Sequence, residues 1–175
     1  IGHALGERGE RVDMALVIGP DGAVLAHEVR DPVSRTPIML RELPTEQFSV
    51  THPMMTPWLA RSLPEGILET GIGFLVVGSA EVGTGDDVRL VVTGQLLNDA
   101  RVAELGALTS TGFGLASMTG RSSLGSDLVS QQSVLESQGE LAMGATVIIP
   151  NGKHGVAVGA LKDLRGIPAI ALAVE

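Results

Sequence analysis

Residues 12–29 read VDMALVIGPDGAVLAHEV, in which two apolar runs flank the short sequence Gly19-Pro20-Asp21-Gly22. The proline presets its own φ angle, the aspartate can accept a hydrogen bond from the backbone that follows it, and the last glycine tolerates a positive φ angle. The flanking runs carry side chains that are typical of strands. The stretch therefore predicts a β-hairpin, whose two arms are Val12–Ile18 and Ala23–Val29.

The register of this hairpin is expected to bring two titratable side chains together. Counting outward from the turn, with Val17 opposite Ala23, places Asp13 opposite His27. Side chains that face one another on paired strands approach to about 5 Å. Asp13 and His27 are therefore candidates for an acid–base pair.

The following segment, residues 30–57, contains five prolines and predicts little regular structure. We expect one short strand at Ile38–Arg41 and a short helix at Thr56–Ser62, which Thr56 would cap. A long irregular segment inside a domain is typical of a lid, a binding loop or an arm that packs on a neighbouring subunit. His52 precedes one of the prolines and is a further candidate for an acid–base role.

Two helices and five more strands are expected in the rest of the chain. One helix begins after Asn98 and runs to about Leu108, and a second covers roughly Ser126–Gln138 and ends at Gly139. The apolar runs predict strands at Ile72–Val77, Val88–Thr93, Ala145–Ile149, Val156–Leu161 and Ile167–Val174. The pattern predicts a single α+β domain over residues 1–175, with a mainly antiparallel sheet, hairpins near both termini and two central helices.

The composition limits the classes of function. The chain has 175 residues, a net charge of −8 and no cysteine, which excludes disulfides and Cys-ligated zinc. Basic and aromatic side chains form no cluster, so nucleic acid is not an expected partner. The apolar runs are far shorter than the roughly 18 residues of a membrane span, and no signal segment opens the chain, so we expect a cytoplasmic protein without a membrane partner. The apolar fraction of 44% favours a homo-oligomer over a monomer with an alanine-rich surface.

A stretch rich in Gly, Ser and Thr, residues 110–123, is the main candidate for a ligand site. Small residues let a ligand approach the backbone, and a helix that begins soon afterwards would direct N–H groups at an anion. The candidate ligand-binding residues are Ser110, Thr111, Gly112, Arg121, Ser122 and Ser123, of which Arg121 could form a forked contact with a carboxylate or phosphate. The stretch matches neither the P-loop nor the dinucleotide-binding pattern, so no cofactor is assigned. A flexible or interface loop between helices explains the composition equally well.

The histidines predict no metal site. They are His3, His27, His52 and His154, and no two of them have the spacing of a helical metal motif. A strand histidine such as His27 is more often packed or exposed than a ligand, and His154 follows a turn where solvation is expected.

Ile1-Gly2-His3-Ala4-Leu5 together with Val17–Gly22 resembles the start of the formaldehyde-activating enzymes. That family condenses formaldehyde with a tetrahydropterin. The resemblance covers residues 1–22 alone and requires a gap, and the histidine that the family carries on its second strand corresponds to Asp13 or Met14 here. A β-hairpin with this turn sequence would produce much of the same likeness, so we take no function from it.

Two hypotheses about function follow from the sequence. In the first, the chain is a small oligomeric enzyme acting on a small polar or anionic metabolite, with its site at or near a subunit interface. His52 or the Asp13–His27 pair would move protons, and Arg121 with the Gly/Ser/Thr stretch would bind the substrate. In the second, the chain is a non-catalytic oligomer that senses a ligand or takes part in an assembly, and the same stretch is an interface element.

Overall fold

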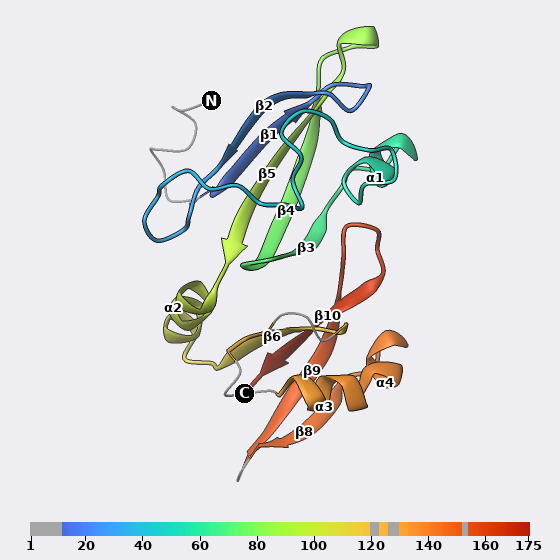
Figure 1. The fold of residues 1–175 in the computed structure, drawn as a ribbon. Helices are drawn as coiled ribbons and strands as arrows, with labels where there is room; N and C mark the ends of the chain where they lie inside the picture. Colours follow the sequence, from blue (N-terminus) through green and yellow to red (C-terminus); the bar gives the residue numbers. More distant parts are fainter. Residues whose placement is uncertain (1–11, 120–122, 126–129, 152–153) are drawn as a thin grey trace. The chain divides into compact units, whose positions relative to one another are not determined.

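The structure is a computed structural model that describes residues 12–119, 123–125, 130–151 and 154–175. The chain divides into two compact units, residues 1–96 and residues 97–175. Each unit contains one antiparallel sheet of five strands (Figure 1). The α+β class and the antiparallel sheet expected from the sequence are confirmed, whereas the single-domain organisation stays a prediction.

The sheet of the first unit has the strand order β2-β1-β5-β4-β3. Its strands are β1 (Met14–Ile18), β2 (Val24–Val29), β3 (Gly66–Thr70), β4 (Gly73–Val82) and β5 (Arg89–Leu97). The predicted N-terminal hairpin is confirmed, because β1 and β2 pair in antiparallel fashion. Alternate side chains of β1, namely Met14, Leu16 and Ile18, are fully buried. This alternation is the one expected of a strand with one face on the core.

The proline-rich segment covers part of the first unit's core. Phe48 donates its N–H to the carbonyl of Gly22 at 2.9 Å, and the phenyl ring is buried together with Met54 and Met55. Helix α1 (Met55–Leu59) follows, close to the predicted Thr56–Ser62. The strand predicted at Ile38–Arg41 is wrong, because pairing is limited to an isolated bridge between Arg30 and Pro37. Proline has no N–H to extend such a ladder.

Strand β3 was not expected from the sequence. Its run, Gly66–Thr70, is short and lies between Pro64 and Gly71, so the apolar pattern does not predict a strand there. The strand pairs with β4. Between β4 and β5 lies the 3₁₀ turn η1 (Gly85–Asp87).

The sheet of the second unit has the strand order β7-β6-β10-β9-β8. Its strands are β6 (Phe113–Ser117), β7 (Ser123–Leu124), β8 (Val147–Asn151), β9 (His154–Lys162) and β10 (Pro168–Val174). Its helices are α2 (Asp99–Thr109), α3 (Gln131–Glu136) and α4 (Gln138–Ala142). The predicted C-terminal hairpin is confirmed by the pairing of β9 with β10, and the first central helix is confirmed with Asn98 as its cap.

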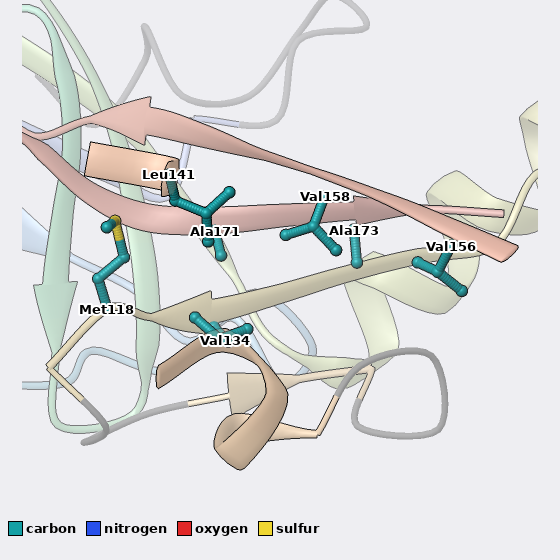
Figure 2. Close-up of a cluster of buried hydrophobic side chains, with 8 residues drawn as sticks. Met118, Val134, Leu141, Val156, Val158, Ala171 and Ala173 are labelled. Carbon is teal, nitrogen blue, oxygen red and sulfur yellow. The ribbon is translucent and has the colours of Figure 1, made fainter. Parts of the chain in front are cut away.

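Two details of the second unit differ from expectation. The second helix, predicted over Ser126–Gln138, is two short helices, and Gly139 lies inside α4 instead of ending a helix. Residues 126–129 lie outside the described residues. Helices α3 and α4 each bury one aliphatic side chain, Val134 and Leu141, against small residues of the sheet. Figure 2 shows this cluster, which is completed by Ala116, Met118, Val156, Val158, Ala171 and Ala173.

Candidate functional site

A hollow of about 300 Å³ lies in the first unit, where three segments meet. Helix α1 and the residues after it form one wall, the β1–β2 turn forms another, and β4 with the β4–β5 connection forms the third. Figure 1 shows this turn and this connection at the same end of the sheet. The lining residues are Pro20, Trp58, Leu59, Arg61, Glu81, Gly85 and Val88.

The end of α1 determines where Arg61 lies. The N–H of Ser62 bonds the carbonyl of Pro57, and the N–H of Arg61 bonds the carbonyl of Trp58, both at 2.9 Å. These two bonds form a Schellman motif, whose penultimate residue must take a left-handed backbone and is usually glycine. Here it is Arg61, with a φ angle of 64°. A residue with a side chain costs about 1 kcal/mol in that conformation.

Trp58 and Glu81 are joined by a hydrogen bond. The indole Nε1–H of Trp58 donates to Glu81 Oε1 at 2.5 Å. Trp58 is 8% exposed, whereas Glu81 on β4 is exposed. The bond therefore fixes the indole and holds the carboxylate at the hollow, because a buried indole N–H needs an acceptor.

The two charges at the hollow are not paired with each other. Arg61 and Glu81 form no ion pair, and no residue in the described part of the chain accepts a hydrogen bond from the Arg61 guanidinium. An unpaired guanidinium offers five N–H donors in a planar fork that fits a carboxylate or phosphate. The hollow thus presents one cation and one anion, with apolar surface from Leu59 and Val88 beside them.

Asp13, a predicted acid–base residue, is held in a structural contact instead. Its side chain is 1% exposed. Its Oδ1 forms a short ion pair with Arg35, and its Oδ2 accepts the N–H of Leu96 at 3.0 Å. Arg35 Nη2 also donates to the carbonyl of Val12 at 3.2 Å. We call this the Asp13–Arg35 clasp, because it ties the proline-rich segment to the start of β1 and the end of β5.

The predicted pairing of Asp13 with His27 is wrong. His27 lies opposite Leu16, and the residue opposite Val29 is Met14. The predicted register would place Ile18 opposite Gly22, whereas the structure places it opposite Val24, and a bulge at the next pair adds one more residue to β2. A bulge shifts the register of all residues beyond it. Counting residues outward from the turn could not reveal it.

His27 is packed on the hairpin with one ring nitrogen unpaired. Its Nε2 atom is buried and has no hydrogen-bond partner. Burial lowers the pKa of His27 below the ordinary value of 6.5, although a hydrogen bond to its own backbone opposes this shift. A histidine in such surroundings is stable in its neutral form.

His52 uses both ring nitrogens to bind backbone. Its Nε2 donates to the carbonyl of Glu42 at 2.8 Å, and its Nδ1 accepts the N–H of Met54 at 3.2 Å. The ring also meets the edge of Phe48, with centroids 4.7 Å apart. Burial lowers the pKa of His52, and the bond to Glu42 partly offsets it. These contacts fix the proline-rich segment, and an acid–base role for His52 stays a prediction.

The Gly/Ser/Thr stretch does not form the loop between helices that its composition suggested. Its middle part, Phe113–Ser117, is β6, an inner strand of the second sheet. Ser110, Thr111 and Gly112 precede this strand, whereas Ser123 follows it on β7, opposite Ala116. The structure therefore divides the candidates between the two ends of β6. Arg121 and Ser122 lie outside the described residues.

The backbone of Ser110–Gly112 is held by contacts within the second unit. Ser110 ends α2 in a left-handed conformation with φ 53°, and the carbonyl of Gly112 accepts the N–H of Glu175 at 3.2 Å. Their role in ligand binding stays a prediction.

The described residues form neither a metal site nor a helix that could span a membrane. No group of three or more His, Asp or Glu side chains in this part of the chain could hold a metal ion. No helix there is long and apolar enough to cross a membrane.

Comparison with known proteins gives little beyond the fold. No family model matches the chain, and no curated protein matches it. A solved structure, that of the extracellular domain of a putative histidine kinase, is similar with a TM-score of 0.47 and 12% identity, over 93% of this chain and 68% of that one. That domain is extracellular, which is contrary to the cytoplasmic location expected from the sequence, and we do not retain that expectation.

Sequence reasoning missed Trp58, Arg61 and Glu81 as site residues. Trp58 is the sole tryptophan and one of four aromatic residues in the chain, which was a usable signal because buried tryptophans need a hydrogen-bond acceptor. Arg61 lay inside the predicted helix Thr56–Ser62, so its place beyond the end of α1, where glycine is usual, was not expected. Glu81 carried no signal, because its place at the hollow depends on the pairing of β4 with β3 and β5.

Proposed function

We propose that this chain is a non-catalytic binding module that takes a small polar molecule into the hollow beside Trp58. The observation that carries the proposal is the Arg61 guanidinium, which lines the hollow and has no partner among the described residues. Binding sites for small molecules combine apolar walls with a few convergent polar groups. The hollow has both kinds of group. A sensing or carrier role fits this arrangement better than catalysis.

The placement of the candidate catalytic residues supports a module without chemistry. General acid–base catalysis needs a titratable group that can reach a substrate, or a partner that activates it. Asp13 is bound to Arg35 and to backbone, His52 is bound to backbone through both nitrogens, and His27 faces Leu16. These contacts support a role of the three side chains in the fold of the first unit.

The test uses Trp58 as its reporter, because it is the sole tryptophan of the chain and it lines the hollow. The full chain is titrated with single metabolites that are anionic, cationic, zwitterionic or neutral, and tryptophan emission is recorded. We expect at least one class to shift the emission saturably and to be recovered unchanged, as judged by mass spectrometry. A chemically altered ligand would contradict a non-catalytic role.

A matched variant locates the binding. Val88→Phe places a larger side chain at the lining and should abolish the emission change, whereas Thr93→Val on the exposed part of β5 should leave it intact. If no class of metabolite shifts the emission of the unchanged chain, the proposal fails.

We also propose that the chain works as a homo-oligomer. Large apolar side chains are exposed in both units, among them Met39 at 78%, Leu108 at 76% and Met143 at 83%. Apolar side chains that gather on a surface often mark an interface. Native mass spectrometry of the purified chain should show a discrete assembly, and a monomer at micromolar concentration would overturn this part of the proposal.

A further inference from the structure

The conformation of Arg61 calls for a reason, because the same position could hold glycine without strain. Two arginines in the described part of the first unit have a positive φ angle, Arg35 at 60° and Arg61 at 64°. For Arg35 the reason is visible, since its guanidinium binds the buried carboxylate of Asp13. Backbone strain persists where the surrounding structure or a function compensates for it. Arg61 has no such carboxylate among the described residues, so we look for its partner in the hollow.

The charges of the lining limit what this partner can be. Arg61 and Glu81 are the charged members of the lining, and the nearby Asp87 pairs with Arg89 at 3.5 Å. A simple anion would be attracted by Arg61 and repelled by Glu81, and a simple cation would meet the reverse. A molecule that carries both charges gives each protein group an opposite charge and places neither beside a like charge.

The size and the walls of the hollow further restrict the class of ligand. A volume of about 300 Å³ is at the lower end of the range for small-molecule sites, roughly 300–1,000 Å³. A nucleotide or a large cofactor is therefore disfavoured. Leu59 and Val88 offer apolar contact beside the two charges.

We propose that the hollow binds a free α-amino acid with an aliphatic side chain. The ligand carboxylate forms a forked contact with Arg61, and its ammonium group binds the Glu81 carboxylate, whose other oxygen holds Trp58. The aliphatic side chain lies against Leu59 and Val88. This inference rests on the proposed function and adds the class of ligand to it.

The experiment compares leucine with three analogues that each lack one feature. Leucine methyl ester lacks the carboxylate, N-acetylleucine lacks the ammonium group, and 4-methylpentanoate has the carboxylate without the amine. Binding to the full chain is measured by Trp58 emission and by calorimetry. We expect leucine to bind at least 10-fold more tightly than each analogue, because a missing group leaves a charge of the hollow unpaired. Equal binding of leucine and its methyl ester would overturn the assignment.

Two variants test the roles of the charged residues. Arg61→Gly should weaken the binding of leucine at least 10-fold. We expect this variant to fold, because glycine suits the left-handed backbone. Glu81→Gln keeps an oxygen for the Trp58 N–H and removes the charge. This variant should bind leucine more weakly but 4-methylpentanoate more tightly, because residue 81 no longer repels the carboxylate of the ligand. If Glu81 had only a structural role, its substitution would change the affinity for both ligands in the same direction. That result would contradict the assignment.

The outcomes separate this inference from the proposed function. If another class of metabolite shifts the Trp58 emission and leucine does not, the binding module stands and the amino-acid assignment fails. If no metabolite shifts it, both fail.

Discussion

Arg35 and Arg61 share a strained backbone conformation but differ in what their side chains meet. Arg35 binds Asp13, which is 1% exposed. Arg61 lines a hollow and is exposed. The strain is similar because the φ angles differ by a few degrees, so the difference lies in the partner. One arginine closes a contact inside the unit, and the other presents its charge to the outside.

The same contrast divides the other polar residues of the first unit. His52 and Asp13 bind backbone groups that hold the proline-rich segment in place. Glu81, in contrast, holds the indole of Trp58 at the rim of the hollow and is exposed. Sequence patterns identify titratable residues of both kinds, but only their contacts distinguish a structural role from a binding role.

Replacing Arg35 with glycine should give the largest effect on stability. The substitution relieves the strained backbone but leaves Asp13 buried without its cation. Breaking a buried pair costs about 3 kcal/mol where one partner is part-exposed, against the 3–5 kcal/mol of fully buried pairs. With a gain of about 0.5 kcal/mol from the backbone, we expect a net loss of about 2.5 kcal/mol. Urea unfolding followed by Trp58 emission measures it.

The control for this variant is Arg35→Gly combined with Asp13→Asn, which removes the unpaired charge. The double variant should recover part of the lost stability, because an amide is cheaper to bury than a carboxylate. If Arg35→Gly alone leaves the urea midpoint unchanged, the clasp contributes no stability and the contrast with Arg61 disappears.

Mild acid should reduce the stability of the first unit through its two structural histidines. Burial lowers the folded-state pKa of His27 and His52 below the ordinary value of 6.5. The unfolded chain therefore binds more protons than the folded chain below pH 6.5, and stability falls as the pH drops through that value. We expect a lower urea midpoint at pH 5.5 than at pH 7.5, with a smaller loss than in Arg35→Gly. His27→Leu should reduce this pH dependence, and an unchanged dependence would show that His27 has no part in it.

Much of the fold could be predicted from the sequence, whereas the site could not. The β1–β2 hairpin, helix α2 and the β9–β10 hairpin follow from local signals, namely turn residues, a capping asparagine and apolar runs. The small residues of the stretch 110–123 suggested a loop. In the structure, Gly114 and Ala116 belong instead to β6, an inner strand that packs against helices. The hollow depends on three segments that are distant in sequence, and the bulge in β2 has no local signature. Long-range pairing therefore decided what the sequence could not show.

Replacing Arg61 with glycine should have the opposite sign of effect from the same change at Arg35. Relief of the left-handed strain gives about 1 kcal/mol, and the greater freedom of glycine in the unfolded chain removes about half of it. Since no described residue binds the Arg61 side chain, we expect a net gain of about 0.5 kcal/mol in the same urea experiment. A lower stability of Arg61→Gly than of the unchanged chain would show that the Arg61 side chain has a structural partner.

Ser110→Gly should have the smallest effect and sharpens the comparison in the second unit. Ser110 also has a left-handed backbone, at the end of α2, and was a candidate ligand residue by its sequence. Glycine at this position should stabilise the helix end by at most about 0.5 kcal/mol, measured by the urea midpoint of far-ultraviolet circular dichroism. Leucine binding to the hollow should not change, because Ser110 does not line it. A loss of leucine binding as large as that of Arg61→Gly would instead assign the ligand to the segment between α2 and β6. The proposed contrast between Arg61, with a binding role, and Ser110, without one, would then be wrong.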